Sequence, residues 1–128
     1  MILDTCALLF LANGDRGLTI ATRARLGTLP VRWFCAISTF EIALKQADGK
    51  LSLPSSAQTW MEDVVERYAL TEVVVDSALC AAAVALPMHH RDPCDRSIIA
   101  AALRLAVPVV TIDQKFTAYG VTVVARVR

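Results

Sequence analysis

The sequence lacks a marked excess of either charge. It has 13 lysines and arginines against 12 aspartates and glutamates, which gives a formal net charge of +1. A chain so balanced has no overall field that attracts nucleic acid, so binding of RNA or DNA would need a local basic patch. Internal repeats, low-complexity stretches and linkers are missing too. A length of 128 residues without such boundaries predicts a single domain over residues 1–128.

Long apolar runs and a secretory signal are also missing. The longest nearly unbroken apolar run, Ala78 to Met88, is too short to cross a bilayer and contains Pro87. Residues 1–12 have no basic leading segment and carry Asp4, which does not fit a signal peptide. We therefore expect no membrane-spanning helix and no membrane partner, and we expect the chain to act in the cytoplasm.

Cysteine pairs of the kind that bind zinc are absent. The four cysteines form no C-x-x-C pair and show no zinc-like spacing to the two histidines; they are Cys6, Cys35, Cys80 and Cys94. We expect reduced, mostly buried thiols, as in a reducing compartment. Cys6 and Cys94 adjoin acidic residues, but no base motif lies nearby, so we interpret both as small core residues rather than nucleophiles.

What the sequence does contain is an alternation of apolar, valine-rich segments with helix-like segments. The predicted strands are 1–4, 33–37, 70–75, 107–112 and 121–124. The predicted helices are 6–12, 17–29, 38–48, 55 or 56 to 68, 76 or 77 to 87, and 93–106, with a turn at 13–15 and a short helical turn at 114–119. Nearly continuously apolar strands alternating with helices indicate an α/β sandwich of three layers, with a central, mostly parallel sheet of four or five strands flanked by helices.

Four acidic residues stand where an apolar strand gives way to a helix start: Asp4, Glu41, Asp95 and Asp113. Ligands of open parallel sheets bind beyond the carboxyl ends of the strands, so residues distant in sequence can become neighbours there. Two carboxylates about 4 Å apart repel by about 4 kcal/mol at an effective dielectric of about 20, and a divalent cation relieves that repulsion. Hard oxygen ligands select Mg²⁺ or Mn²⁺. The pattern therefore predicts one metal pocket.

Each acid also has a structural interpretation. Glu41 stands three residues after Ser38, a candidate helix cap onto which a glutamate folds back. Asp95 falls in a first helical turn, where the macrodipole favours a carboxylate by about 0.3–1 kcal/mol, and Asp113 can cap the turn that follows it. Asp4 is the hardest to explain in this way. Burying a lone carboxylate after an apolar strand costs several kcal/mol unless it is paired or bound to metal.

Other polar residues lie close to these acids in the sequence. His89 and His90 could carry protons or bind a metal, but a histidine pair beside arginine in a loop is interpreted here as solvated surface. Three hydroxyl residues could orient the acids or cap helices: Thr5, Ser38 and Thr111. Three basic residues could hold an RNA backbone: Lys45, Arg91 and Arg96. Arg96 could instead pair with its own helix or with a partner protein.

Four segments together resemble PIN-domain nucleases, specifically VapC-type toxins of bacterial toxin–antitoxin pairs. They are 3–5, 38–45, 90–100 and 111–116. The most specific is Asp-Pro-Cys-Asp-Arg at 92–96, directly before Ser97 and an Ile-Ile-Ala run. The resemblance implies a PIN-like sandwich and the same four acids as the acidic quartet, with Asp92 as a helix cap. Cys6 and Cys94 stand where close relatives often have histidine and phenylalanine.

The resemblance also implies an activity and partners. It implies a Mg²⁺- or Mn²⁺-dependent endoribonuclease that hydrolyses RNA phosphodiester bonds, forms a homodimer and is neutralised by a cognate VapB-type antitoxin. We expect Asp4 and Asp95 as direct metal ligands, and Glu41 and Asp113 as ligands or groups that position water. The apolar, arginine-bearing stretch 8–29 is the expected antitoxin-binding surface.

Two other functions remain open at this point. One is a catalytically silent PIN-like module that binds RNA or protein, against which the retained acids argue. The other is a phosphoacceptor signalling domain, which would need an adjacent pair of acids early in the chain. The segment Ile2-Leu3-Asp4 offers only one acid.

Overall fold

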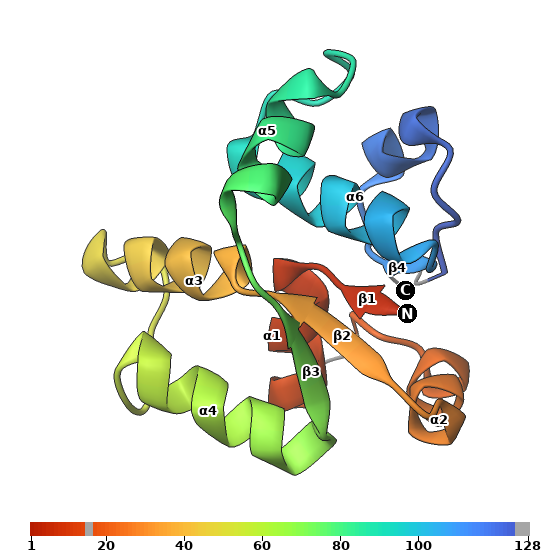
Figure 1. The fold of residues 1–128 in the computed structure, drawn as a ribbon. Coiled ribbons are helices and arrows are strands. Elements are labelled where there is room, and N and C mark those ends of the chain that lie inside the picture. Colours follow the sequence, from red (N-terminus) through yellow and green to blue (C-terminus); the bar gives the residue numbers. More distant parts are fainter. Residues whose placement is uncertain (15–16, 125–128) are drawn as a thin grey trace.

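The structure, a computed structural model, describes residues 1–14 and 17–124 of the chain. In chain order the elements are β1 (Ile2–Leu3), α1 (Thr5–Asn13), α2 (Ile20–Thr28), β2 (Arg32–Cys35), α3 (Ile37–Ala47), α4 (Ala57–Tyr68), β3 (Leu70–Val73), α5 (Ser77–Ala85), α6 (Pro93–Leu105), β4 (Val109–Val110) and the 3₁₀ helix η1 (Gln114–Tyr119). The strands form one parallel sheet in the order β3-β2-β1-β4, with helices on both faces (Figure 1). The predicted α/β sandwich is confirmed, with four strands.

Neighbouring residues of each strand face opposite sides of the sheet. Leu3 and Phe34 join a hydrophobic core with α1 and α4, whereas Ile2 and Cys35 join a second core with α5 and α6. This alternation is the period of two that a pleated strand imposes, and burial of both faces explains why the strands are apolar throughout. In Figure 1, α1 and α4 accordingly lie on one side of the sheet, and α5 and α6 on the other.

Parallel pairing brings distant parts of the chain to one edge of the sheet. Leu3 of β1 is paired with Phe34 of β2 on one side and with Val110 of β4 on the other. The residues that follow these three strands therefore emerge together at the carboxyl edge. They are Asp4 at the start of α1, the first turn of α3, and Thr111 after β4.

The strands are shorter than the sequence predicts. β2 ends at Cys35, and Ile37 already begins α3. The predicted fifth strand at 121–124 is wrong, because this segment meets the sheet at a single point, a parallel bridge between Val109 and Val123. Two backbone hydrogen bonds fix that point: Val109 N–H donates to the Thr122 carbonyl at 2.8 Å, and Val124 N–H donates to the Val109 carbonyl at 3.0 Å.

Most helix starts follow a side-chain cap. Ser56 begins α4, Asp76 begins α5 and Asp92 begins α6, each accepting a hydrogen bond from a backbone N–H two or three residues later. The predicted cap of α3 is wrong. The helix begins at Ile37, so Ser38 lies inside it and is buried. Of the predicted turn at 13–15, Gly14 ends α1 in a left-handed conformation, and residue 15 lies outside the described residues.

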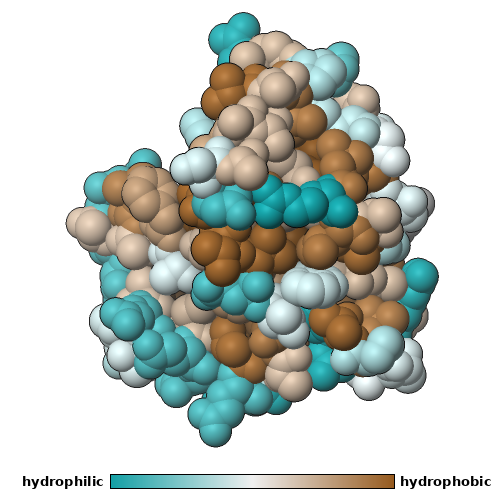
Figure 2. Space-filling view, viewed as in Figure 1, coloured by the Kyte–Doolittle hydropathy of each residue, from teal (hydrophilic) through white to brown (hydrophobic). Residues whose placement is uncertain are grey.

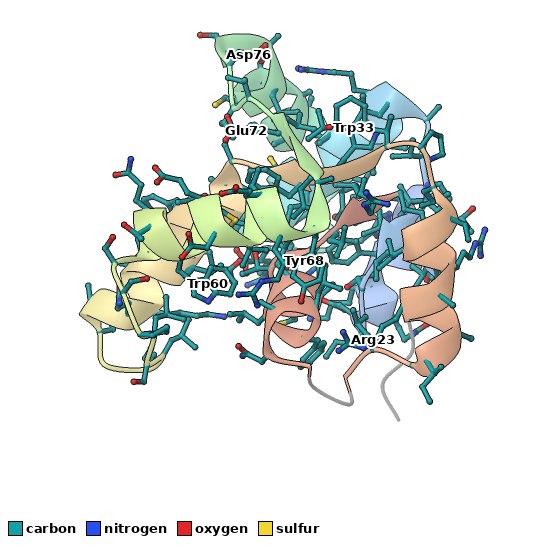
Figure 3. All side chains as sticks on the ribbon, turned by 90° about the horizontal axis from the view of Figure 1, so that it is seen from below. Arg23, Trp33, Trp60, Tyr68, Glu72 and Asp76 are labelled. Atoms are coloured by element: carbon teal, nitrogen blue, oxygen red, sulfur yellow. The ribbon has the colours of Figure 1, made fainter. Side chains whose placement is uncertain are left out.

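The surface follows the expected division between polar and apolar residues. The charged face of α4 is exposed, and Figure 2 shows hydrophilic atoms over this helix at the lower left of the view. Viewed from below, Trp60 and Tyr68 come from the same helix (Figure 3), and Trp60 is buried in the core. Within the described residues, every helix is too short or too polar to cross a membrane. All four cysteines are free thiols; Cys35 and Cys94 are buried, whereas Cys80 is exposed.

Candidate functional site

The structure brings the four predicted acids to the same edge of the sheet from four different elements. Asp4 caps α1, Glu41 lies on α3, Asp95 lies in the first turn of α6, and Asp113 caps η1. Their charges reach one another: Glu41 and Asp113 both raise the pKa of Asp4, although burial raises it more. The acids are thus spatial neighbours, as the parallel sheet predicts.

Asp4 is buried but not without partners. One carboxylate oxygen, Oδ1, accepts the backbone N–H of Ala7 at 2.8 Å, and the other, Oδ2, accepts the hydroxyl of Thr111. Burial raises the pKa of Asp4 to about 6, and the two hydrogen bonds oppose that rise without cancelling it. Asp4 therefore has both roles considered from the sequence: it caps α1, and it is a buried carboxylate whose charged form is disfavoured.

Thr111 connects two of the acids. Its hydroxyl donates to Asp4 and accepts the backbone N–H of Asp113 at 3.0 Å, and the side chain is fully buried. The hydroxyl of Thr5 donates to the hydroxyl of Ser38 at 2.9 Å and thereby ties α1 to α3. None of these three hydroxyl residues caps a helix. They hold the elements that carry the acids.

Glu41 has one engaged and one unengaged oxygen. Its Oε2 lies 3.4 Å from the ammonium of Lys45, one helical turn away. Its Oε1 is buried and has no hydrogen-bond partner among residues 1–14 and 17–124. Because Ser38 is not a cap, the predicted folding back of Glu41 onto it does not occur. A buried carboxylate oxygen without a donor calls for a ligand, and a cation would supply one.

His90 belongs to the site although the sequence interpretation placed it on the solvated surface. Its side chain is buried, and Nε2 lies 2.8 Å from Oδ2 of Asp113 and 2.9 Å from Oδ2 of Asp95. The neighbouring His89 is exposed, as expected. Both histidines stand in the loop that enters α6, and no local signal in the sequence indicated which of them would turn toward the acids.

The pKa of Asp95 rises to about 7. Burial is the largest cause, followed by the charge of Asp92; His90 opposes the rise, and Glu41 and Asp4 add to it. Within the described part of the chain, no hydrogen bond reaches the second oxygen of Asp95, Oδ1. The Asp95 carboxylate therefore lies close to other acids, and its Oδ1 is available to bind a cation.

The two cysteines beside the acids stay protonated. Burial raises the pKa of Cys94 to about 12, with the charges of Glu41 and Asp92 as further causes. Burial also raises the pKa of Cys6, followed by the charge of Asp4. A thiol so far from ionisation is a poor nucleophile, which agrees with the sequence interpretation of both residues as packing groups.

Arg96 does not face solvent and is not available to RNA. It is buried, and its guanidinium donates to four backbone carbonyls, that of Val84 in α5 and those of Leu86, Pro87 and His90 in the segment between α5 and α6. These contacts are with the preceding helix and loop, so they match neither the pairing with its own helix nor the pairing with a partner protein considered from the sequence. Arg91 is exposed, and Lys45 lies beside Glu41.

The donor set of the site fits a hard divalent cation. Most of the groups available are carboxylate oxygens, and a ligand atom from each of His90, Asp95 and Asp113, a nitrogen in the case of His90, lies within 4.8 Å of the others. Oε1 of Glu41 has no partner among the described residues, and burial, with neighbouring acids as further causes, raises the pKa of Asp4 and Asp95. Mg²⁺ and Mn²⁺ prefer such oxygen ligands.

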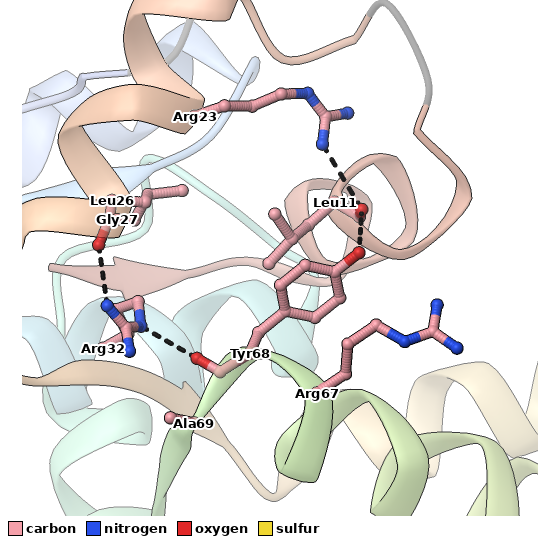
Figure 4. A pocket seen from close by; sticks show the side chains of 8 residues that line it. All are labelled: Leu11, Arg23, Leu26, Gly27, Arg32, Arg67, Tyr68 and Ala69. Carbon is pink, nitrogen blue, oxygen red and sulfur yellow. Dashed lines mark hydrogen bonds between the residues drawn. The ribbon is translucent and has the colours of Figure 1, made fainter.

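A second hollow lies at the other edge of the sheet, where β2 and β3 begin (Figure 4). It has a volume of about 360 Å³ and is lined by Leu11, Arg23, Leu26, Gly27, Arg32, Arg67, Tyr68 and Ala69. Arg23 and the Tyr68 hydroxyl both donate to the Leu11 carbonyl, and Arg32 donates to the carbonyls of Leu26 and Tyr68. These donors satisfy the ends of α1, α2 and α4, so the hollow has a structural explanation.

This hollow bears on the predicted antitoxin surface at 8–29. Leu8 and Leu11 of α1 are buried in the core, so most of the apolar side of that stretch is not exposed. Ile20 at the start of α2 is 87% exposed. Among the described residues of this stretch, Ile20 is thus the fully exposed large apolar side chain, while Leu9 and Phe10 of α1 are half-buried.

Comparison with known proteins gives a family match and two similar folds. Residues 1–121 match the family model described as PIN domain. A chain of a structure described as FitAB bound to an IR36 DNA fragment is 20% identical, with a TM-score of 0.68 over 96% of this chain and 92% of that chain. A chain of FitAcB from Neisseria gonorrhoeae is 19% identical, with a TM-score of 0.65 over 95% of this chain and 94% of that chain. No curated protein matches the sequence. At such identities the two structures show a shared fold.

Proposed function

This chain belongs to the PIN domain family, and from that premise we propose that it is a metal-dependent endoribonuclease and the toxin of a toxin–antitoxin pair. The observation that supports the metal most directly is the buried, unpartnered Oε1 of Glu41 at an edge shared with three aspartates. A module that had lost its activity would have no physical reason to keep this unbalanced charge, which costs stability. The silent alternative is therefore disfavoured.

The acids take different parts in this proposal. Asp4, Glu41 and Asp95 would hold the cation, because each presents carboxylate oxygen at the carboxyl edge of the sheet. A bound Mg²⁺ or Mn²⁺ would polarise the scissile phosphate and lower the pKa of an attacking water. Asp113 completes the acidic quartet, and Thr111 holds it in register with Asp4 through one hydroxyl.

RNA is the proposed substrate, and the exposed basic side chains near the site would meet its backbone. Arg91 lies in the loop before α6, and Lys45 lies beside Glu41 on α3. Contacts to phosphate give position and affinity without reading sequence. Arg96, being buried, has no part in binding RNA.

The proposed partners follow from the family and from the sequence resemblance. We propose a cognate VapB-type antitoxin, a homodimer and action in the cytoplasm. The structural neighbours described as FitAB and FitAcB support an assembly with a second kind of chain. Exposed α2, with Ile20 at its start, is the part of the predicted antitoxin surface that a partner can reach.

Cleavage of RNA tests the proposal. Purified, antitoxin-free protein would be incubated with end-labelled total RNA and Mg²⁺ or Mn²⁺, beside EDTA, an Asp95→Asn variant and an Asp63→Asn control from the exposed face of α4. We expect cuts that require the metal, persist in the control and disappear in Asp95→Asn. Absence of cleavage with both metals, together with metal-independent RNA binding, would instead identify a silent RNA-binding module.

A further inference from the structure

We propose that His90 is a positioning residue of the candidate metal centre: an imidazole of fixed tautomer that donates its Nε2 proton to Asp113, lies against Asp95 and does not bind the metal itself. The effect of His90 on metal binding, and through it on catalysis, rests on the proposed function. The tautomer itself follows from hydrogen-bond geometry alone, so the two can fail separately.

The tautomer is set by the backbone of Asp92. Its N–H donates to Nδ1 of His90 at 3.2 Å. A backbone N–H has no acceptor capacity, so Nδ1 must present a lone pair, and the single proton of the ring then resides on Nε2. That proton is donated to Oδ2 of Asp113 at 2.8 Å, and Oδ2 of Asp95 lies 2.9 Å from the same nitrogen. An imidazole nitrogen that carries a proton has no lone pair left for a metal.

The ring and the backbone of His90 are both held by η1 and α6, the elements that carry the two acids. Phe116 of η1 meets the imidazole edge to face, with ring centroids 5.9 Å apart. The backbone N–H of His90 donates to the Tyr119 hydroxyl at 2.7 Å, and the guanidinium of Arg96 donates to the His90 carbonyl at 3.0 Å. Such support on both backbone and side chain indicates that the position of this ring, and not merely its bulk, matters.

This arrangement assigns the oxygens of both acids. Asp113 accepts from His90 at Oδ2 and from the Lys115 backbone N–H at Oδ1, at 2.9 Å, so both of its oxygens are engaged. Oδ2 of Asp95 lies 2.9 Å from the same nitrogen, but within the described residues neither oxygen of Asp95 accepts a hydrogen bond. His90 thereby holds Asp113 as an orienting group rather than a ligand and leaves the oxygens of Asp95 available to the metal.

Nuclear magnetic resonance tests the tautomer directly. Protein labelled with ¹⁵N-histidine would be recorded at neutral pH, first free of metal and then with saturating Mg²⁺, with exposed His89 as an internal reference. We expect an unprotonated Nδ1 and a protonated Nε2 for His90 in both states. A proton on Nδ1, protons on both nitrogens, or loss of the Nε2 proton when Mg²⁺ binds would overturn the proposal.

Metal binding tests the consequence. Mn²⁺ affinity, measured by calorimetry on variants whose circular dichroism is unchanged, should fall about 10–100-fold in His90→Ala, the range typical of residues that orient metal ligands. His90→Gln, whose amide can donate in place of Nε2, should recover most of the affinity, and His89→Ala should match the wild type. Wild-type affinity in His90→Ala would overturn the positioning role. Failure of the wild type itself to bind Mn²⁺ would instead overturn the proposed function, and the resonance experiment would still decide the tautomer.

Discussion

At the scale of single residues, the four acids differ in how their oxygens are occupied. Asp4 and Asp113 have a donor on each oxygen, whereas Glu41 has a buried oxygen with none among the described residues. An unmet buried acceptor costs about 1–3 kcal/mol, and more when it is charged. Glu41 is therefore the acid that contributes least to the stability of the fold and that is best suited to bind a cation.

This difference predicts the behaviour of Glu41→Gln. Without metal, we expect the variant to be at least as stable as the wild type, because the change removes a negative charge from a cluster of acids. Its Mn²⁺ affinity should fall by about tenfold or more. Thermal unfolding in EDTA and calorimetric titration measure the two quantities, with exposed Glu66→Gln on α4 as the control. A less stable variant with unchanged affinity would show that Glu41 serves the fold.

The sequence predicted which acids form the site better than it predicted which side chains surround them. Asp4 stood out because a lone acid after an apolar strand needs a partner, and the structure supplies Thr111, 107 positions away. His90 was missed because nothing local distinguishes it from His89. What separates them is burial of the His90 ring against Phe116 and its hydrogen bond with Asp113, which only the folded chain creates.

At the scale of elements, the segment between α5 and α6 is held by one side chain. Arg96 donates to three of its carbonyls and to that of Val84 in α5, and the Tyr119 hydroxyl donates to the Pro87 carbonyl at 2.7 Å. These bonds fix the backbone of His90 and the entry into α6. The arginine next to Asp95 thus acts on the site by shaping the loop that faces it.

Arg96→Lys is expected to loosen this segment. An ammonium is a compact donor that cannot span the carbonyls reached by a planar guanidinium, and buried carbonyls left without donors should cost about 2–4 kcal/mol of folding free energy. Urea unfolding measures that loss, and Mn²⁺ titration should show weaker binding. Arg104→Lys on the exposed side of the same helix is the matched control and should change neither quantity appreciably. Equal stability of the two variants would contradict the role given to Arg96.

Helix starts could be predicted from sequence because a cap is a local feature. Asp76 and Asp92 each bond a backbone N–H within three residues. The prediction of Ser38 as a cap is wrong because its hydroxyl instead accepts a hydrogen bond from the Thr5 hydroxyl. This contact joins two helices and cannot be predicted from the local sequence. Strand lengths failed for a similar reason: a strand ends where its neighbour stops pairing, and at 121–124 the neighbour offers a single bridge.

At the scale of the whole molecule, a formal net charge of +1 conceals a strong local imbalance. The acids gather at the carboxyl edge of the sheet, while arginines gather around the hollow at the other edge (Figure 4). Asp4 and Asp113 come after β1 and β4, whereas Glu41 comes from α3 and Asp95 from α6, so the order β3-β2-β1-β4 together with the packing of these two helices gathers the scattered carboxylates into one negative region. The parallel sheet class was predictable from alternation, and so was the edge at which the acids would meet.

Gathering these acids makes stability depend on pH. The pKa of Asp4 is raised from 3.8 to about 6, mainly by burial, and the pKa of Asp95 from 3.8 to about 7, by burial and then by the charge of Asp92. Above about pH 4 the unfolded chain has released both protons, whereas the folded chain holds that of Asp4 up to about pH 6 and that of Asp95 up to about pH 7. The folded state then binds more protons, so its stability falls as pH rises through this window.

The expected measurement is a set of urea unfolding curves in EDTA at about pH 5 and about pH 7.5 for wild type, Asp95→Asn and an Asp63→Asn control. The wild type should lose stability relative to Asp95→Asn on going to the higher pH, because the amide cannot ionise. Mg²⁺ should restore wild-type stability more at the higher pH than at the lower one, since the cation binds the ionised carboxylates and competes with their protons. A wild type that instead gains stability over Asp95→Asn as pH rises would show that the fold itself balances the charge of this edge.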